Sequence, residues 1–97
     1  MIASFADRAT EDIFDGTNLS HARKCLPRQL WGLAVRKLDQ LDSATELSDL
    51  RVPPGNRLEV LTADRAGQHS IRINDQYRVT FRWEQGHAYE VRVEDYH

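Results

Sequence analysis

The side chains best suited to proton transfer are neighbours at positions 95–97, where Asp95, Tyr96 and His97 supply an acid, a phenol and an imidazole. Imidazole exchanges protons near neutral pH, so His97 is a candidate general acid or base. Metal-free cleavage of RNA needs a base for the 2′-hydroxyl, an acid for the 5′-oxygen and cations at the phosphate. These three residues and nearby arginines could supply those parts. The alternative is a solvated tail with no catalytic role.

Arginine dominates the cations of this chain, because only Lys24 and Lys37 among its 13 basic residues are lysines. The planar guanidinium group suits phosphate oxygens and base edges. The cations of the second half are all arginines, namely Arg51, Arg57, Arg65, Arg72, Arg78, Arg82 and Arg92. The formal net charge of −2 nevertheless argues against a general polyanion binder. A solvated surface with cross-strand ion pairs would give the same composition.

Other kinds of catalytic site have little support in the sequence. The residues that could ligate a metal do not occur at zinc-site spacings; they are Cys25, His21, His69, His87 and His97. Gly55, Gly67 and Gly86 stand alone in expected turns, so no phosphate-binding loop is expected. We therefore expect neither a metal nor another cofactor. Cys25 is expected to be a small, partly buried residue and not a nucleophile.

Two helices are expected in the first half of the chain to position this chemistry. Asp7 can cap a short helix that ends near Phe14, and Gly16 can stop it. Residues 17–25 are polar and predict a loop or the frayed start of a helix. A stripe with helical spacing predicts a second helix after Pro27, and its members are Leu30, Ala34, Leu38 and Leu41.

The second half has the alternation of β-strands. Strands are expected over residues 57–62, 69–73 and 76–83, with a last strand from Tyr89 onward. Residues 2–5 also resemble a short strand. Short turns join the consecutive strands, so they should pair antiparallel. The 97 residues therefore predict a single α+β domain, in which an antiparallel sheet carries both N-terminal helices on one face.

Strand alternation predicts a polar face on the side of the sheet away from the helices. Tyr89, Val91 and Val93 are expected to face the helices, and Glu94 to face away from them. The arginines expected on the polar face are Arg72, Arg78, Arg82 and Arg92. If the last strand continues, Tyr96 lies at the end of this face. Such a surface suits RNA, although one wet face is normal for an antiparallel sheet.

Cysteine usage and hydropathy indicate the compartment. Cys25 is the only cysteine, which is typical of a reducing environment. A membrane-spanning helix needs about 20 apolar residues, and the apolar runs here are only a few residues long. The first residues also lack the basic and apolar regions of a secretion signal. We therefore expect a cytoplasmic protein without a membrane partner.

Several segments resemble the HigB-type toxins, which belong to the RelE/ParE superfamily of type II toxin–antitoxin systems. These segments are LRVPPGNRLE at residues 50–59, DRAGQHSIRINDQYR at residues 64–78, and the terminal DYH. The resemblance implies a RelE-like fold and metal-independent cleavage of mRNA in the decoding site of the ribosome, which inhibits translation. It also implies a HigA-like helix-turn-helix antitoxin as partner. The pair would repress its own operon, with operator DNA bound only through the antitoxin.

The resemblance also implies roles for individual residues. Asp95, Tyr96 and His97 match the terminal catalytic group, Arg78 matches an arginine at the scissile phosphate, and Arg65 matches a substrate-side arginine. Three further arginines are expected to bind the substrate, namely Arg57, Arg72 and Arg82. Some members have a histidine and a lysine where this chain has Glu59 and Thr62. Glu59 is thus either a general base or an ion-pair partner of the nearby Arg57.

Two alternative functions remain open at this point. A ParE-like protein would inhibit DNA gyrase through contacts alone and would have no need of Asp95, Tyr96 and His97. A degenerate toxin would act only in operon repression through its antitoxin, and Glu59 and Thr62 keep this possibility open.

Overall fold

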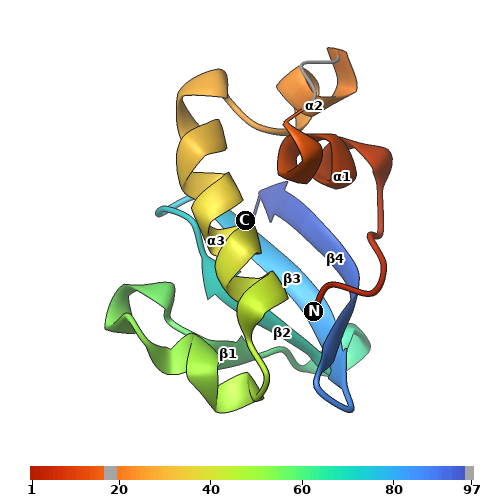
Figure 1. Ribbon diagram of the computed structural model, residues 1–97, viewed down its shortest axis with the longest axis vertical. Helices are drawn as coiled ribbons and strands as arrows, with labels where there is room; N and C mark the ends of the chain where they lie inside the picture. Colours follow the sequence, from red (N-terminus) through yellow and green to blue (C-terminus); the bar gives the residue numbers. More distant parts are fainter. Residues whose placement is uncertain (17–19, 96–97) are drawn as a thin grey trace.

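An antiparallel sheet forms one layer of the protein. The computed structural model describes residues 1–16 and 20–95. The four strands of the sheet lie in the order β1-β2-β3-β4. They are β1 (Glu59–Val60), β2 (Gln68–Arg72), β3 (Tyr77–Glu84) and β4 (His87–Asp95). The helices α1 and α3 form the other layer on one face of this sheet (Figure 1). The expected α+β class and antiparallel sheet are therefore confirmed.

Helix α1 (Arg8–Asp15) begins and ends where the sequence predicts. The Asp7 carboxylate accepts a hydrogen bond from the Thr10 N–H (2.8 Å), which satisfies a free donor at the helix start. Gly16 ends the helix at φ +78°, a left-handed conformation that favours glycine. The buried Thr10 hydroxyl accepts a bond from the Val93 N–H (2.9 Å), which ties α1 to β4.

The helices that follow α1 differ from the prediction, because the described residues contain three α-helices and not two. Helix α2 (Ser20–Cys25) occupies part of the segment where a loop or helix start was expected. Buried Ala22, together with Leu26 just after the helix, gives this short helix an apolar side to pack. Helix α3 (Trp31–Ser43) follows, and the predicted stripe residues Ala34, Leu38 and Leu41 are fully buried.

Strand β1 is much shorter than the expected residues 57–62. Arg57 has φ +47°, which breaks the extended conformation just before the strand. Thr62 precedes a 3-10 turn at Ala63–Arg65, which ends the strand on the other side. Residues 2–5 contribute only isolated parallel bridges to β4 and form no strand. None of the described helices is long and apolar enough to span a membrane.

A bulge in β4 changes the expected alternation. Thr80 pairs with Arg92 but Arg82 pairs with Tyr89, so two residues of β4 lie opposite one residue of β3. Glu90, one of these two residues, has φ +54°. Paired residues share a face, so Tyr89 lies on the face of Arg82 and not on the helix side with Val91. The prediction for Tyr89 is therefore wrong, because an inserted residue reverses strand parity.

Candidate active site on the polar face of the sheet

The strand register assembles a row of arginines on the face of the sheet opposite the helices. Arg72 pairs with Arg78, which in turn pairs with Glu94. Arg82 and Arg92 belong to neighbouring pairs on the same face, through Gln68 and Thr80 respectively. The apolar pairs on the other face, such as Ile71 with Val79, belong to the core. The arginine-rich face predicted from alternation is therefore present.

The guanidinium group of Arg65 reaches this face from the 3-10 turn and forms a two-pronged contact with Glu94. Its Nη1 donates to Oε1 of Glu94 (2.7 Å) and its Nη2 to Oε2 (3.0 Å). Its Nε and Nη2 also donate to the Gln68 side-chain oxygen (3.2 and 2.8 Å). Thr80 Oγ1 donates to Oε2 of Glu94 (2.8 Å). Such forked, charge-assisted contacts hold both position and orientation, so Arg65 is preorganised.

Glu94 is ionised in this network. The side chain is only 14% exposed, and burial on its own would raise the pKa of Glu94. Hydrogen bonds from Arg65 and Thr80, with the charges of Arg65 and Arg92, outweigh burial and lower the pKa below its ordinary value. Glu94 therefore serves as the fixed anion of this face.

Arg78 lies at the centre of the face and is also held by neighbours. Its side chain is 14% exposed, its Nη1 donates to the Ser70 hydroxyl (3.4 Å), and its Nη2 lies 3.6 Å from a Glu59 carboxylate oxygen. Glu59 was expected either as a general base or as an ion-pair partner of Arg57. In the structure Glu59 forms an ion pair with Arg78, so its carboxylate lies beside the arginine row.

The other predicted arginines are not all brought together. Arg72 lies on the polar face and forms an ion pair with Asp75 in the adjoining turn. Arg82 is exposed on the same face. Arg57 is separate from this row, because it lines a cavity bounded by Leu58, Val60 and the 47–54 segment. The structure therefore groups Arg65, Arg72, Arg78 and Arg82 but leaves Arg57 apart.

Asp95 is the last described residue of β4. It pairs with Tyr77 across the sheet, so it points to the side opposite Glu94. The Gln76 side-chain amide donates to its carboxylate (2.8 Å). Tyr96 and His97, two of the three residues expected to carry proton transfer, lie outside the described residues.

A polar hollow of about 330 Å³ adjoins the Arg65–Glu94 contact. Its lining residues are Ala6, Arg65, Gln68, Thr80, Glu90 and Arg92. The volume lies in the range of small-ligand sites, about 300–1,000 Å³. Two arginines, Arg65 and Arg92, and one carboxylate, Glu90, line the hollow, so its lining carries a net positive charge.

Sequence reasoning missed Glu94, Thr80 and Gln68 as parts of this site. Glu94 and Thr80 have the strand parity of Arg78 and Arg92, so the alternation placed them on the correct face. Nothing in the sequence, however, indicated that Arg65 folds back onto Glu94, because the contact joins residues 29 positions apart.

The family model and two similar proteins that this chain matches carry the same name. Residues 3–97 match the family described as RelE-like toxin of type II toxin-antitoxin system HigB. The chain is 39% identical over 88 residues to Toxin HigB-1 of Vibrio cholerae, covering 91% of this chain and 90% of that protein. It is 38% identical over 61 residues to Endoribonuclease HigB of Proteus vulgaris, covering 63% of this chain and 65% of that protein.

Proposed function

The chain belongs to the HigB-like family of type II toxins, and from this premise we propose that it is an endoribonuclease that cleaves mRNA on the ribosome and thereby inhibits translation. The observation that carries the proposal is the convergence of Arg65 and Arg78 on the polar face beside Glu94. The name of the Proteus vulgaris relative, Endoribonuclease HigB, supports the same class of activity.

The arginines are suited to bind the phosphate at the cleavage point. A phosphorane intermediate carries more negative charge than the phosphodiester, and fixed guanidinium donors stabilise the charge that develops. Arg65 and Arg78 now contact Glu94 and Glu59 respectively. A phosphate group entering this face would replace the Glu59 contact of Arg78, at 3.6 Å the longer of the two, since both ligands suit the guanidinium fork.

The sequence keeps the candidate proton-transfer residues close to Glu94 along the chain. His97 follows Asp95 by two residues in the sequence. Asp95 directly follows Glu94, which contacts Arg65 and pairs with Arg78. The proposal assigns proton transfer at a phosphate bound by these arginines to His97.

The proposed reaction transfers protons through this imidazole. His97 removes the proton of the RNA 2′-hydroxyl, and the 2′-oxygen attacks the adjacent phosphorus. The bond from phosphorus to the 5′-oxygen then breaks, the protonated His97 returns its proton to the leaving oxygen, and a 2′,3′-cyclic phosphate remains. Asp95 orients His97, and Tyr96 supports the mRNA by stacking or hydrogen bonding.

Ribosome dependence agrees with the charge of the protein. The formal net charge of −2 gives little general attraction to RNA. On the polar face, Arg65, Arg72, Arg78 and Arg92 each have a carboxylate partner. In our proposal the ribosome positions the mRNA, and the toxin supplies only the local site.

The family also defines the class of partner. A type II toxin is held by a protein antitoxin, and we propose that this antitoxin is HigA-like, with a helix-turn-helix. The toxin–antitoxin pair would repress its own operon, with the antitoxin making the contacts to operator DNA. The toxin itself would act in the cytoplasm.

The test is to map the 5′ ends of cellular mRNA after induction of the wild type, His97→Ala and His87→Ala. His87 is the control, because it is a histidine at the first residue of β4, whose last residue is Asp95. We expect new 5′ ends inside translated regions for the wild type and His87→Ala, and none for His97→Ala. Unchanged cleavage by His97→Ala would overturn the proposed role of this residue.

A further inference from the structure

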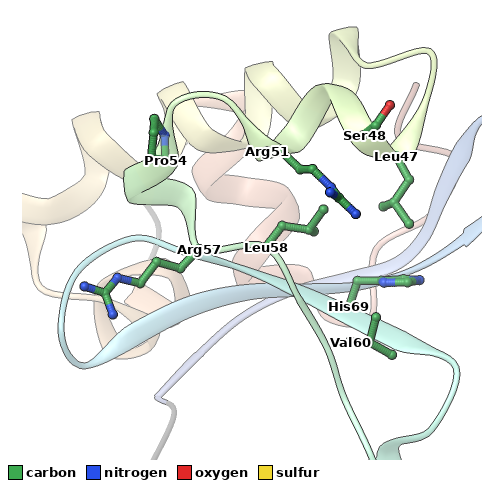
Figure 2. A pocket seen from close by; sticks show the side chains of 8 residues that line it. All are labelled: Leu47, Ser48, Arg51, Pro54, Arg57, Leu58, Val60 and His69. Atoms are coloured by element: carbon green, nitrogen blue, oxygen red, sulfur yellow. The ribbon is translucent and has the colours of Figure 1, made fainter.

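A second cavity lies on the helix side of the sheet, at the edge formed by β1. It encloses about 520 Å³ between the 3-10 segment Leu47–Arg51, the following loop and strands β1 and β2. Its apolar walls come from Leu47, Pro54, Leu58 and Val60 (Figure 2). Val60 is 68% exposed, although it is a large apolar residue. The cavity thus combines apolar walls with an exposed apolar side chain at its rim.

The charge of this cavity is entirely positive. In Figure 2, Arg51 extends from the 47–51 segment toward the sheet, and Arg57 lies at one end of the cavity. None of the described residues that line it is acidic. The two other polar side chains of the lining are Ser48, which has no charge, and His69. Burial lowers the pKa of His69 below its ordinary value, which favours its neutral form. An occupant with both apolar and acidic groups would complement these surroundings.

The backbone beside the cavity offers unused hydrogen-bonding groups. Leu61 donates its N–H to the Gln68 carbonyl (2.9 Å), so Leu61 and Glu59 direct their backbone groups toward β2. Alternation in an antiparallel ladder then turns the N–H and C=O of Val60 away from β2. Because β1 is an edge strand of the described sheet, these two groups face the open edge.

The wall opposite the sheet is held in place from within. Asn56 is fully buried, and its side-chain amide donates to the Leu50 carbonyl (3.1 Å) and to the Gln40 side-chain oxygen (3.0 Å). Lys37 of α3 donates to its Oδ1 (2.5 Å). These bonds tie residues 50–56 to α3. The cavity is therefore a preformed feature, and preformed sites lose less entropy on binding.

We propose that this cavity and the edge of β1 form the docking surface for the cognate antitoxin. The antitoxin would present an extended segment that bonds to Val60 of β1, inserts an apolar side chain among Leu47, Leu58 and Pro54, and places carboxylates near Arg51 and Arg57. An extended peptide fits better than RNA, because aliphatic walls and a free strand edge are features of peptide recognition by strand addition. The described lining of the cavity also offers no Phe, Tyr or Trp side chain on which an RNA base could stack.

The proposal rests on membership of a type II toxin family and not on the proposed RNA cleavage. The docking surface is at the β1 edge on the helix side, whereas the Arg65–Glu94 contact is on the other face. Antitoxin binding and mRNA cleavage can therefore be measured separately, and each can fail without the other.

The first experiment compares two substitutions of exposed valines. Val60→Asp puts a charge at the cavity rim, and Val52→Asp puts the same charge at a valine that is equally exposed, at 68%, but does not line the cavity. We expect Val60→Asp to weaken the affinity of the purified toxin for its antitoxin at least tenfold, and Val52→Asp by less than threefold. Equal losses, or no loss with Val60→Asp, would overturn the proposal.

The second experiment tests charge and strand addition without relying on Val60→Asp. Arg51→Glu should weaken antitoxin binding at least tenfold, whereas Arg36→Glu on an exposed part of α3 should not. In the wild type, hydrogen exchange of the Val60 amide should slow when the antitoxin binds. An unprotected Val60 amide would contradict strand addition. Unchanged antitoxin affinity combined with lost binding of Arg51→Glu to mRNA-programmed ribosomes would assign the cavity to the ribosome complex instead.

Discussion

At the scale of single residues, the position of Arg65 depends on Glu94. The Glu94 carboxylate receives both prongs of the guanidinium group and the Thr80 hydroxyl, at distances of 2.7–3.0 Å. A carboxylate that holds an arginine in this way fixes the direction in which the arginine can meet a phosphate. We regard Glu94 as a positioning residue for the proposed reaction.

Glu94→Gln tests this contact through stability. The substitution keeps the shape of the side chain but removes its charge, and we expect a loss of about 1–2 kcal/mol in the free energy of unfolding at pH 7. Because folding lowers the pKa of Glu94, its contribution is present above the ordinary pKa, near 4.5. It is lost as the pH falls through the lowered value.

Denaturant unfolding at pH 7 and pH 3 measures this difference. Exposed Glu84 of β3 provides the control substitution, Glu84→Gln. The difference in the free energy of unfolding between the wild type and Glu94→Gln should shrink toward zero at the lower pH. A gap that is unchanged between the two pH values would mean that the ion pair does not stabilise the fold.

Cys25 should be a poor nucleophile in the folded protein. Burial, with the nearby negative charge of Asp7, raises the pKa of the Cys25 thiol to about 11, despite an opposing effect of Arg92. Only the thiolate reacts with alkylating agents. We expect iodoacetamide at pH 8 to label the folded chain at least tenfold more slowly than the chain unfolded in denaturant. Equal rates, followed by mass spectrometry, would contradict this assignment.

At the scale of elements, the bulge in β4 decides which side chains face the arginine row. The inserted residue puts Tyr89 on the polar face while keeping Val91 and Val93 in the core. Alternation in the sequence predicted the strand but not the bulge, because Glu90 has no conformational signature such as glycine. The short α2 was missed for a related reason, since six residues are too few to show a helical period.

Glu90→Gly is the test of this bulge. Glu90 has φ +54°, where a side chain is strained and glycine is not. We expect the substitution to raise the free energy of unfolding by about 0.5–1 kcal/mol. Glu84→Gly, at the last residue of β3 and without a positive φ, should lower it by a similar amount. Thermal unfolding of the two variants gives the comparison, and a loss of stability with Glu90→Gly would argue against the left-handed bulge.

At the scale of the whole molecule, the sheet separates two surfaces with different chemistry. One face carries arginines that are matched by carboxylates, and the helix side at the β1 edge carries an apolar cavity with two arginines. Local patterns predicted the α+β class, the α1 caps and the arginine face, since these depend on neighbouring residues. A local pattern does not encode how distant segments pack. This packing decides the Arg65–Glu94 contact, the pairing of Glu59 with Arg78 and the position of Arg57 apart from the arginine row.

The central claim is that the terminal histidine and the arginine row cleave mRNA on the ribosome. The most direct test is primer extension on a defined mRNA in a reconstituted translation reaction, run beside a DNA gyrase supercoiling assay. We expect the wild type to cut the mRNA only when ribosomes translate it, with His97→Ala and Arg78→Ala reducing the cleavage rate at least a hundredfold and supercoiling unaffected. Inhibition of gyrase without mRNA cleavage, or full cleavage by both variants, would contradict the account.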